Sequence, residues 1–358
     1  MLNRRAFALS ALSGVLTSPS IASELSFGQC EGSCFNADMP ALGYDEFFAS
    51  IFHLAQSEKL RRQASGRRIR PEMVSLFGHD RMYRPILDSI VIEWQRSADN
   101  FLLSRVRFDL ECGVPVIGCL GVPNSTPRGL MLLAHGMASL PERCFTDDQP
   151  DYMKGIGQKL CQDGYAVWCP YILQAGNQPS QDTMAAMLLS QGVSLHNVSC
   201  SSLEAGETIA SRVVGLPRLK TGRYGVSWGA IFTLHLEAAT GTQRPTVASG
   251  YMRDEKQLLL SPWLIKNLGA PFASYLHFQA NEFKFVGEAM ARLLRPTPIF
   301  IEVGSEDNWN SNEYGRDRIF KEMRSTFGEH GDAITMHVFD GPHEAHGIEA
   351  RKWLLSLV

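Results

Sequence analysis

The sequence predicts an α/β fold in which helices cover both faces of a mostly parallel central sheet. From about residue 101 onward, short apolar runs typical of buried strands alternate with stretches of helical periodicity. A Gly-x-Ser-x-Gly pentapeptide at 225–229 lies between one such run and a helical pattern. Because functional groups in parallel sheets gather at the carboxyl ends of the strands, the functional residues are expected there.

The composition is that of an ordinary globular protein with a sizeable core. Hydrophobic residues make up 44% of the chain and charged residues 20%, and the formal net charge is −3. Basic residues gather at 59–62 and 67–70, where they fit the solvated face of a helix. We therefore expect no nucleic-acid partner. The length of 358 residues allows one large domain or two average ones.

Residues 1–22 have the features of an export signal peptide. Arg4 and Arg5 precede a short apolar core at 8–16, and the small residues up to Ala22 fit a cleavage site. The apolar core is too short to span a bilayer, so no stable membrane anchor is expected. The sequence thus predicts a periplasmic or secreted protein. A twin-arginine signal and an ordinary secretory signal both fit, and a cytoplasmic N-terminal helix is the alternative.

Residues 23–100 are expected to be a helical segment that packs on the core. Apolar residues recur at helical spacing between 44 and 62, and the pattern continues through 85–94. Residues 101–358 carry the alternating pattern and form the predicted α/β domain. Within this domain the aromatic-rich stretch 253–297 is too long for a plain loop and predicts a helical excursion over the strand ends.

The alternating pattern gives the order of elements in the domain. The first two strands are predicted to pair as a hairpin, and the later ones are continuous apolar runs. The expected strands are 103–110, 114–122, 130–134, 165–169, 224–226, 246–250, 298–303 and 334–339. The expected helices are 152–162, 198–214, 229–239, 313–327 and 346–357.

The pentapeptide Gly225-Val226-Ser227-Trp228-Gly229 has the layout of a nucleophile elbow. The turn is sharp, so a side chain at either glycine would collide with neighbouring backbone. The serine takes a strained conformation that projects its hydroxyl outward. Ser227 is therefore the candidate nucleophile. The motif alone also arises by chance, and the alternative is that Ser227 only caps the following helix.

A serine nucleophile needs a histidine to take its proton and a carboxylate to orient the histidine. Both residue types follow strands downstream, in the chain order expected after a nucleophile elbow. Asp307 comes directly after the strand 298–303, and His343 follows the strand 334–339 and a Gly-Pro turn. We predict Asp307 as the acid and His343 as the base.

Other residues near these strand ends remain alternatives. Glu306 and Asp254 are rival acids, whereas Glu302 lies within a strand and is expected to be structural. His346 is the rival base and is expected to begin the closing helix. Its spacing from the preceding histidine is one residue short of the zinc-protease pattern, so no metal site is predicted.

An oxyanion formed at the serine requires two backbone N–H donors. The amide of Trp228, the residue after the nucleophile, is the first candidate. Met137 is the second, because it follows His135-Gly136 at the end of the strand 130–134 and Gly136 allows the backbone to turn inward. The alternative is that His135-Gly136 forms an ordinary strand-ending turn.

All eight cysteines lie beyond residue 22. An oxidising compartment would allow local bridges between Cys30 and Cys34 and between Cys112 and Cys119. The spacing matches no zinc pattern, and no cysteine is assigned a catalytic role.

With these residues placed, positions 100–358 resemble the α/β-hydrolase superfamily, and within it the dienelactone-hydrolase and acetyl-xylan-esterase-like branch. The similarity rests on His135-Gly136, residues 225–230, Ser249-Gly250-Tyr251, residues 295–298 with 304–307, and His343-Glu344. The resemblance implies an α/β-hydrolase fold and a Ser227-His343-Asp307 triad. Dienelactone hydrolases use a cysteine in place of Ser227, and sugar-acetyl esterases usually carry glutamine in place of Trp228, so the resemblance implies no particular substrate.

The residues and the resemblance together predict an exported serine hydrolase that cleaves a small-molecule carboxylic ester through an acyl-enzyme. No metal or organic cofactor is expected, and no pattern predicts an oligomeric state. Two alternatives remain, a serine peptidase with the same triad and a non-catalytic binding protein of the same fold.

Overall fold

The structure is a computed structural model of the chain. It describes residues 70–71, 74–75, 81–98, 100–136, 139–147, 151–172, 188, 190–216, 219–252, 288–307 and 313–357. All of these belong to the second of the two units into which the chain divides, Gly66–Val358. The predicted signal peptide at 1–22, most of the predicted helical segment at 23–100 and the stretch 253–287 lie outside the described residues.

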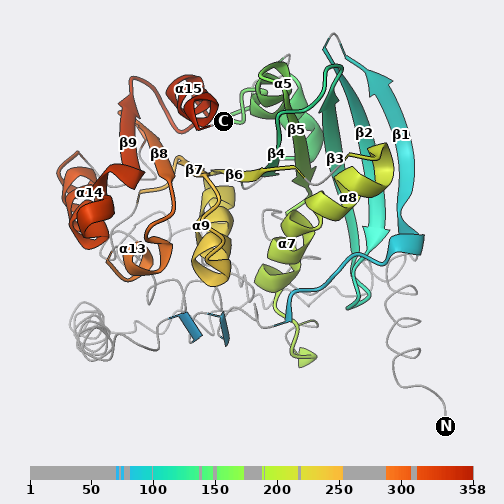
Figure 1. Cartoon of the computed structure of the whole chain (residues 1–358), viewed down its shortest axis with the longest axis horizontal. Coiled ribbons are helices and arrows are strands. Elements are labelled where there is room, and N and C mark those ends of the chain that lie inside the picture. Colours follow the sequence, from blue (N-terminus) through green and yellow to red (C-terminus); the bar gives the residue numbers. More distant parts are fainter. Residues whose placement is uncertain are drawn as a thin grey trace, which may run out of the picture. The chain divides into compact units, whose positions relative to one another are not determined.

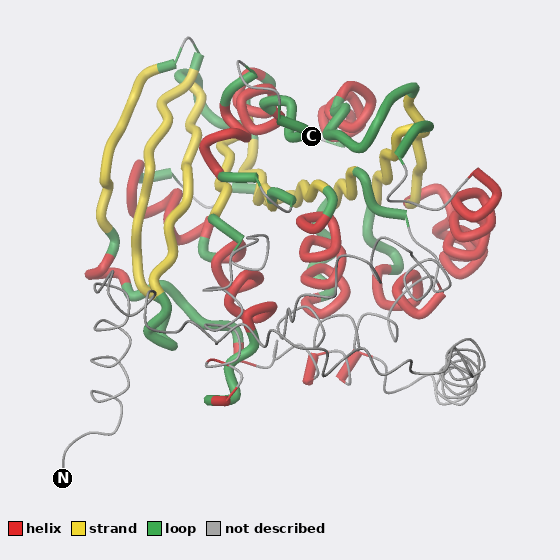
Figure 2. The backbone as a smooth tube through the Cα atoms, turned by 180° about the vertical axis from the view of Figure 1, so that it is seen from behind, coloured by secondary structure: helices red, strands yellow, loops and turns green. Residues whose placement is uncertain are grey.

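A nine-stranded sheet forms the centre of the unit. In chain order its strands are β1 (Val91–Ser97), β2 (Phe101–Asp109), β3 (Pro115–Pro123), β4 (Gly129–Ala134), β5 (Tyr165–Pro170), β6 (Thr221–Val226), β7 (Thr246–Ser249), β8 (Ile299–Gly304) and β9 (Ile334–Phe339). Their order across the sheet is β1-β2-β3-β5-β4-β6-β7-β8-β9. Figure 2 shows the sheet as one twisted layer between helices.

The sheet has an antiparallel part and a parallel part. Strands β1, β2, β3 and β5 pair antiparallel. The predicted hairpin is confirmed, because β2 pairs with β3 along its whole length, with Phe101 opposite Pro123 at one end and Asp109 opposite Pro115 at the other. From β5 through β4 and β6 to β9 all pairs are parallel. Strands β4, β5 and β8 are buried along their whole length, as expected of parallel strands covered on both faces.

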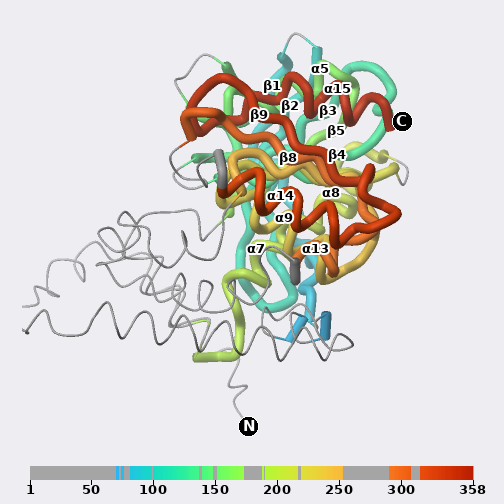
Figure 3. The backbone as a smooth tube through the Cα atoms, turned by 90° about the vertical axis from the view of Figure 1, so that its left-hand side faces the viewer, coloured from blue at the N-terminus to red at the C-terminus, as the bar shows by residue number. Residues whose placement is uncertain are grey.

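Helices cover both faces of the parallel part (Figures 1 and 3). The α-helices are α5 (Ile156–Gln162), α7 (Leu195–Glu204), α8 (Gly206–Val214), α9 (Trp228–Thr240), α13 (Glu288–Leu294), α14 (Glu313–Phe327) and α15 (Ile348–Ser356). The 3-10 segments are η2 (Leu87–Ser89), η3 (Pro141–Phe145) and η6 (Gly328–Ala333). Helices α5 and α15 lie on one face, and α7, α9, α13 and α14 on the other. Each face buries its own hydrophobic cluster against the sheet.

The helical interpretation of residues 85–94 is wrong. This stretch contains the short 3-10 segment Leu87–Ser89 and then strand β1, which pairs with β2. Strand β1 lies at the edge of the sheet and is exposed on both faces except at Trp94, so its sequence lacks the alternation of a half-buried strand. The β-branched run Ile90-Val91-Ile92 is the local feature that favours a strand here.

The local bridge that the sequence allows between Cys112 and Cys119 is not formed, because both cysteines are free. Cys119 lies within β3, opposite Cys169 of β5, and its side chain is buried in the core. Cys30 and Cys34 lie outside the described residues. Among the helices that the structure describes, none is long and apolar enough to span a membrane.

Candidate active site

Ser227 stands at a sharp turn between strand β6 and helix α9. Its backbone has φ +55° and ψ −116°, a strained combination for a residue with a side chain. The residues on either side are buried, whereas Ser227 is half-buried. Its hydroxyl makes no capping hydrogen bond to the helix. The geometry is therefore that of a nucleophile elbow and not that of a helix cap.

The two glycines of the pentapeptide allow this turn because backbone crowds both positions. A Cβ atom at Gly225 would overlap the carbonyl of Gly229 and lie 2.6 Å from Ala230 Cα. A Cβ at Gly229 would overlap the carbonyl of Ala134 and lie 2.7 Å from that of His135. The collisions predicted from the motif are thus present, and helix α9 packs directly against β6 and the end of β4.

Asp307 and His343 meet at the carboxyl ends of β8 and β9. Asp307 Oδ2 lies 2.7 Å from His343 Nδ1. The Asp307 side chain is fully buried and that of His343 is 18% exposed. Two backbone hydrogen bonds join the turns that carry them, from the Ser305 amide to the Phe339 carbonyl at 2.8 Å and from the Glu306 amide to the Gly341 carbonyl at 2.9 Å.

Strand β7 connects this pair to the elbow. The Ser227 amide donates to the Ser249 carbonyl at 2.7 Å. The next residue, Gly250, has φ +65°, and a Cβ atom built on it would lie 3.0 Å from His343 Cε1 and 3.8 Å from Asp307 Oδ2. The His343 imidazole therefore packs against Gly250, the residue after Ser249, and Ser249 is the residue to which the Ser227 amide is hydrogen-bonded. Ser227, His343 and Asp307 share one edge of the sheet.

Of the alternative acids and bases, the structure describes Glu306, Glu302 and His346. Glu306 is exposed, and Asp254 lies outside the described residues. Glu302 is buried within β8, where it accepts hydrogen bonds from Tyr224 Oη at 2.6 Å and from the Gly347 amide at 3.1 Å, so its role is structural. The ring of His346 stacks on Phe339 with centroids 4.4 Å apart.

A buried histidine supports the loop after β4. The Ile172 amide donates to His135 Nε2 at 2.9 Å, which makes Nε2 the acceptor and places the ring proton on Nδ1. Nδ1 then donates to the Gly136 carbonyl at 2.8 Å. Burial lowers the pKa of His135 to about 4, so the ring stays neutral at pH 7 and keeps this tautomer.

The loop that His135 supports packs against the elbow. A Cβ atom at Gly136 would lie 2.9 Å from Ser227 Cβ and 2.9 Å from the Val226 carbonyl. Met137, the predicted second oxyanion donor, lies outside the described residues. Trp228 is the first residue of α9, so its amide lies at the N-terminus of the helix.

Sequence reasoning missed Tyr152, which lies in the turn before α5. Its ring lies 5.8 Å from that of His343, centroid to centroid, and its hydroxyl contacts Gly136. No motif marks this position, because only the folded chain brings the turn to the strand ends. The nearest signal in the sequence is Asp151, a carboxylate directly before the helix predicted over 152–162.

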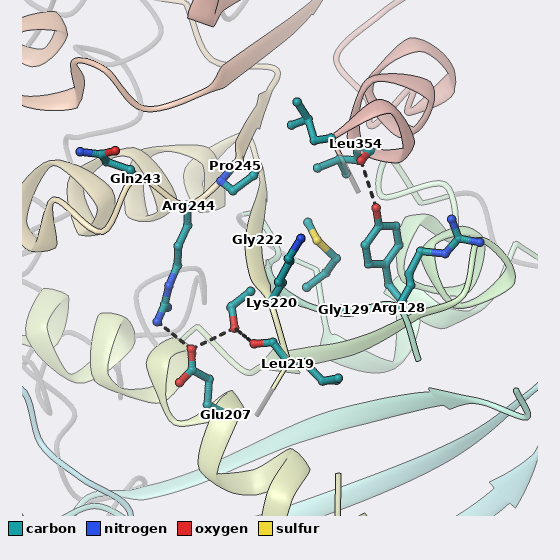
Figure 4. Close-up of a pocket in the computed structure, with 14 residues that line it drawn as sticks. Arg128, Gly129, Glu207, Leu219, Lys220, Gly222, Gln243, Arg244, Pro245 and Leu354 are labelled. Carbon is teal, nitrogen blue, oxygen red and sulfur yellow. Dashed lines mark hydrogen bonds and ion pairs between the residues drawn. The ribbon is translucent and has the colours of Figure 1, made fainter. Parts of the chain in front are cut away.

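A pocket of about 340 Å³ lies at the opposite edge of the sheet. Its lining includes Gly129 and Thr221, the first residues of β4 and β6. Ser227, in contrast, follows the carboxyl end of β6. Figure 4 shows Arg128, Lys220 and Arg244 around it. The pocket contains none of the predicted catalytic residues, so it is separate from the site at the carboxyl ends.

The structure resembles solved structures of several esterases over most of its length. A candidate acetyl xylan esterase from Bacteroides fragilis matches with a TM-score of 0.60 and 14% identity, covering 83% of this chain and 88% of its own. A glucuronoyl esterase from Solibacter usitatus matches with a TM-score of 0.55 and 11% identity, covering 80% and 90%. A methylesterase matches with a TM-score of 0.53 and 15% identity, covering 87% and 66%.

These identities are too low to transfer an activity, so the likeness shows a shared fold. No protein-family model matches the sequence, and no curated protein sequence matches it significantly.

Proposed function

We propose that this chain, which has the α/β-hydrolase fold, hydrolyses carboxylic esters with Ser227 as nucleophile, His343 as general base and acid, and Asp307 as the residue that orients His343. The observation that carries the proposal is the hydrogen bond between Asp307 and His343, beside the strained Ser227 elbow. The esterase names of the three structural neighbours support the choice of an ester over other acyl substrates.

The chemistry follows from which imidazole nitrogen faces the acid. Asp307 accepts from Nδ1–H, so Nε2 exchanges the reacting proton. Ser227 Oγ attacks the ester carbonyl carbon while its proton passes to His343 Nε2. The C–O bond to the alcohol then breaks, and His343 returns that proton to the departing alkoxide. Water, deprotonated by the same nitrogen, attacks the acyl-enzyme and releases the carboxylic acid and free Ser227.

The oxyanion that forms twice in this sequence needs donors that are already in place. We assign one to the Trp228 amide at the start of α9, where the helix dipole also favours negative charge. We assign the second to the Met137 amide, which directly follows the loop residue that packs on Ser227. No step requires a metal or an organic cofactor. The signal-like residues 1–22 support export to the periplasm or the medium.

A fluorophosphonate probe tests the proposal directly. We expect stoichiometric labelling of Ser227, located by mass spectrometry, and hydrolysis of short-chain p-nitrophenyl esters. Ser227→Ala should abolish both. Folded wild-type protein that takes up no label at Ser227 would leave a non-catalytic binding protein as the better interpretation, and faster cleavage of matched peptide amides would favour a peptidase.

His346 supplies a matched control for the base. We expect His343→Ala to lower kcat by about 10⁴-fold or more, since a triad member is lost. The same change at His346, whose ring stacks on Phe339, should leave kcat within a few-fold of wild type. The opposite ranking of the two variants would move the base to His346.

A further inference from the structure

Tyr152 lies beside His343 and beside the Gly136 loop of the candidate site described above. Its ring lies 5.8 Å from that of His343, with 34° between the ring planes. A Cβ atom built on Gly136 would overlap the Tyr152 hydroxyl and lie 2.9 Å from Ser227 Cβ. The phenol oxygen and the nucleophile therefore converge on one small region at the Gly136 loop.

The backbone of this tyrosine is held firmly. Asp151 is buried, and its carboxylate accepts hydrogen bonds from the Met153 amide at 2.8 Å and from Ser139 Oγ at 3.2 Å. The Tyr152 carbonyl in turn accepts from the Ala345 amide at 2.7 Å. The turn is thus fixed both to Ser139, which precedes η3, and to the loop that carries His343, so the Tyr152 backbone has a defined position.

The chemical state of the hydroxyl is also defined. Burial, assisted by the nearby negative charge of Asp151, raises the pKa of Tyr152 well above its usual value. The phenol therefore keeps its proton throughout the pH range in which a Ser-His-Asp site works. A neutral phenol next to the nucleophile is an O–H donor and not a general base.

We propose, on the basis of the function proposed above, that Tyr152 is a further catalytic residue whose Oη–H donates a hydrogen bond to the oxyanion formed on the acyl carbon attached to Ser227. The hydroxyl contacts Gly136, and this loop is the one to which the second backbone donor is assigned. A side-chain donor there adds to the amides and strengthens as the carbonyl oxygen gains charge.

Tyr152→Phe tests this assignment, because phenylalanine keeps the ring against His343 and removes only the hydroxyl. We expect kcat/KM for p-nitrophenyl esters to fall by about 100- to 1,000-fold, mostly through kcat, as for other oxyanion donors. The affinity for a trifluoromethyl ketone, whose adduct with Ser227 imitates the oxyanion, should fall in parallel. The pH at which activity is half-maximal should not move, since His343 and Asp307 keep their contacts.

Tyr165→Phe is the matched control. Tyr165 is a buried tyrosine whose hydroxyl donates to the Leu354 carbonyl at 3.1 Å, at the opposite edge of the sheet. We expect this variant to lose some thermal stability and to keep wild-type kcat. A Tyr152→Phe variant with wild-type kcat and ketone affinity would overturn the assignment.

A shifted pH profile with unchanged ketone affinity would instead make Tyr152 a positioning residue for His343, and so would also overturn it. These outcomes are distinct from failure of the proposed function, which would appear as absent labelling and hydrolysis in the wild-type protein itself.

Discussion

At the scale of single residues, His135 shows how a buried ionisable group fixes a loop. Its neutral ring accepts from Ile172 and donates to the carbonyl of Gly136, and a second proton would break the first of these bonds. The loop in question is the one that packs on Ser227. A histidine that takes no part in the proposed chemistry therefore supports the loop next to Ser227, the proposed nucleophile.

This state of His135 makes stability depend on pH. Its pKa is about 4 in the folded chain, below the 6.5 of an unperturbed histidine, so the unfolded chain binds the proton more readily. The contribution is fully present above pH 6.5 and is lost as the pH falls towards 4, by roughly 3 kcal/mol at most. His135→Gln, which keeps an acceptor for Ile172, should lower stability at pH 7 and flatten the slope between pH 6.5 and 4.

Urea unfolding at several pH values measures this slope. The exposed His330 supplies the control, since His330→Gln should keep the slope of the wild type. Equal slopes for His135→Gln and the wild type would show that His135 is not responsible for the pH dependence.

The residues of the site differ in how far the sequence could predict them. Ser227 lies in a motif that demands glycines for steric reasons. Asp307 and His343 follow the neighbouring parallel strands β8 and β9, whose carboxyl ends meet at one edge of the sheet. Tyr152 reaches the same edge from the turn before α5, and no local sequence pattern predicts its contacts with His343 and Gly136. The supporting role of His135 was missed because it depends on Ile172, a partner that only the fold supplies.

At the scale of elements, the nucleophile elbow depends on close packing of α9 against the strands. Gly229 lies against the carbonyls of Ala134 and His135, so a methyl group there must displace the backbone of β4 or of the helix. We expect Gly229→Ala to destabilise the fold by about 1–3 kcal/mol or more, as overpacking does, and to slow fluorophosphonate labelling of Ser227.

Gly331→Ala is the control for this prediction. A Cβ at Gly331 would lie 3.4 Å from the nearest atom, Arg324 Cγ, which is ordinary contact. Thermal unfolding and labelling rates of the two variants should therefore separate clearly. Equal behaviour would mean that the elbow tolerates a wider turn than the structure shows.

The elements themselves were predicted from the sequence with unequal success, for a physical reason. Parallel strands such as β4 and β8 are buried on both faces, and their sequences are therefore continuous apolar runs. Strand β1 is exposed on both faces at the edge of the sheet, so its sequence does not need to alternate between apolar and polar residues. The helical pattern inferred for 85–94 came from apolar residues that the structure places in a 3-10 segment and this edge strand.

At the scale of the whole molecule, a buried charge network ties the helices to the sheet. Arg223 of β6 is fully buried and pairs with the equally buried Glu237 of α9 and with Glu204 of α7. Glu204 also pairs with Arg244 at 3.0 Å. Glu237 further accepts from Thr297 Oγ1, just before β8, at 3.1 Å. One cluster thus joins segments between residues 204 and 297.

Removing the cation from this network should be costly. We expect Arg223→Met to lower the free energy of unfolding by about 3–5 kcal/mol, because Glu237 would be left buried without its counter-charge. Adding Glu237→Met should recover part of the loss. Urea denaturation measures both, and Arg324→Met, which breaks only an exposed pair with Asp332, should change stability by less than about 1 kcal/mol. An Arg223→Met variant as stable as the wild type would contradict the stabilising role of the Arg223 network.

The arrangement of the parallel strands has a kinetic consequence. Ser227, Asp307 and His343 follow β6, β8 and β9, and β7 lies between the first of these and the other two in the sheet. Each parallel pair forms only after a crossover has closed, so such pairings are slow steps of folding. A partly assembled sheet would present Ser227 without His343, its proposed base. Hydrolytic competence would then arise last, and the time course of its recovery after dilution from urea would report completion of this half of the sheet.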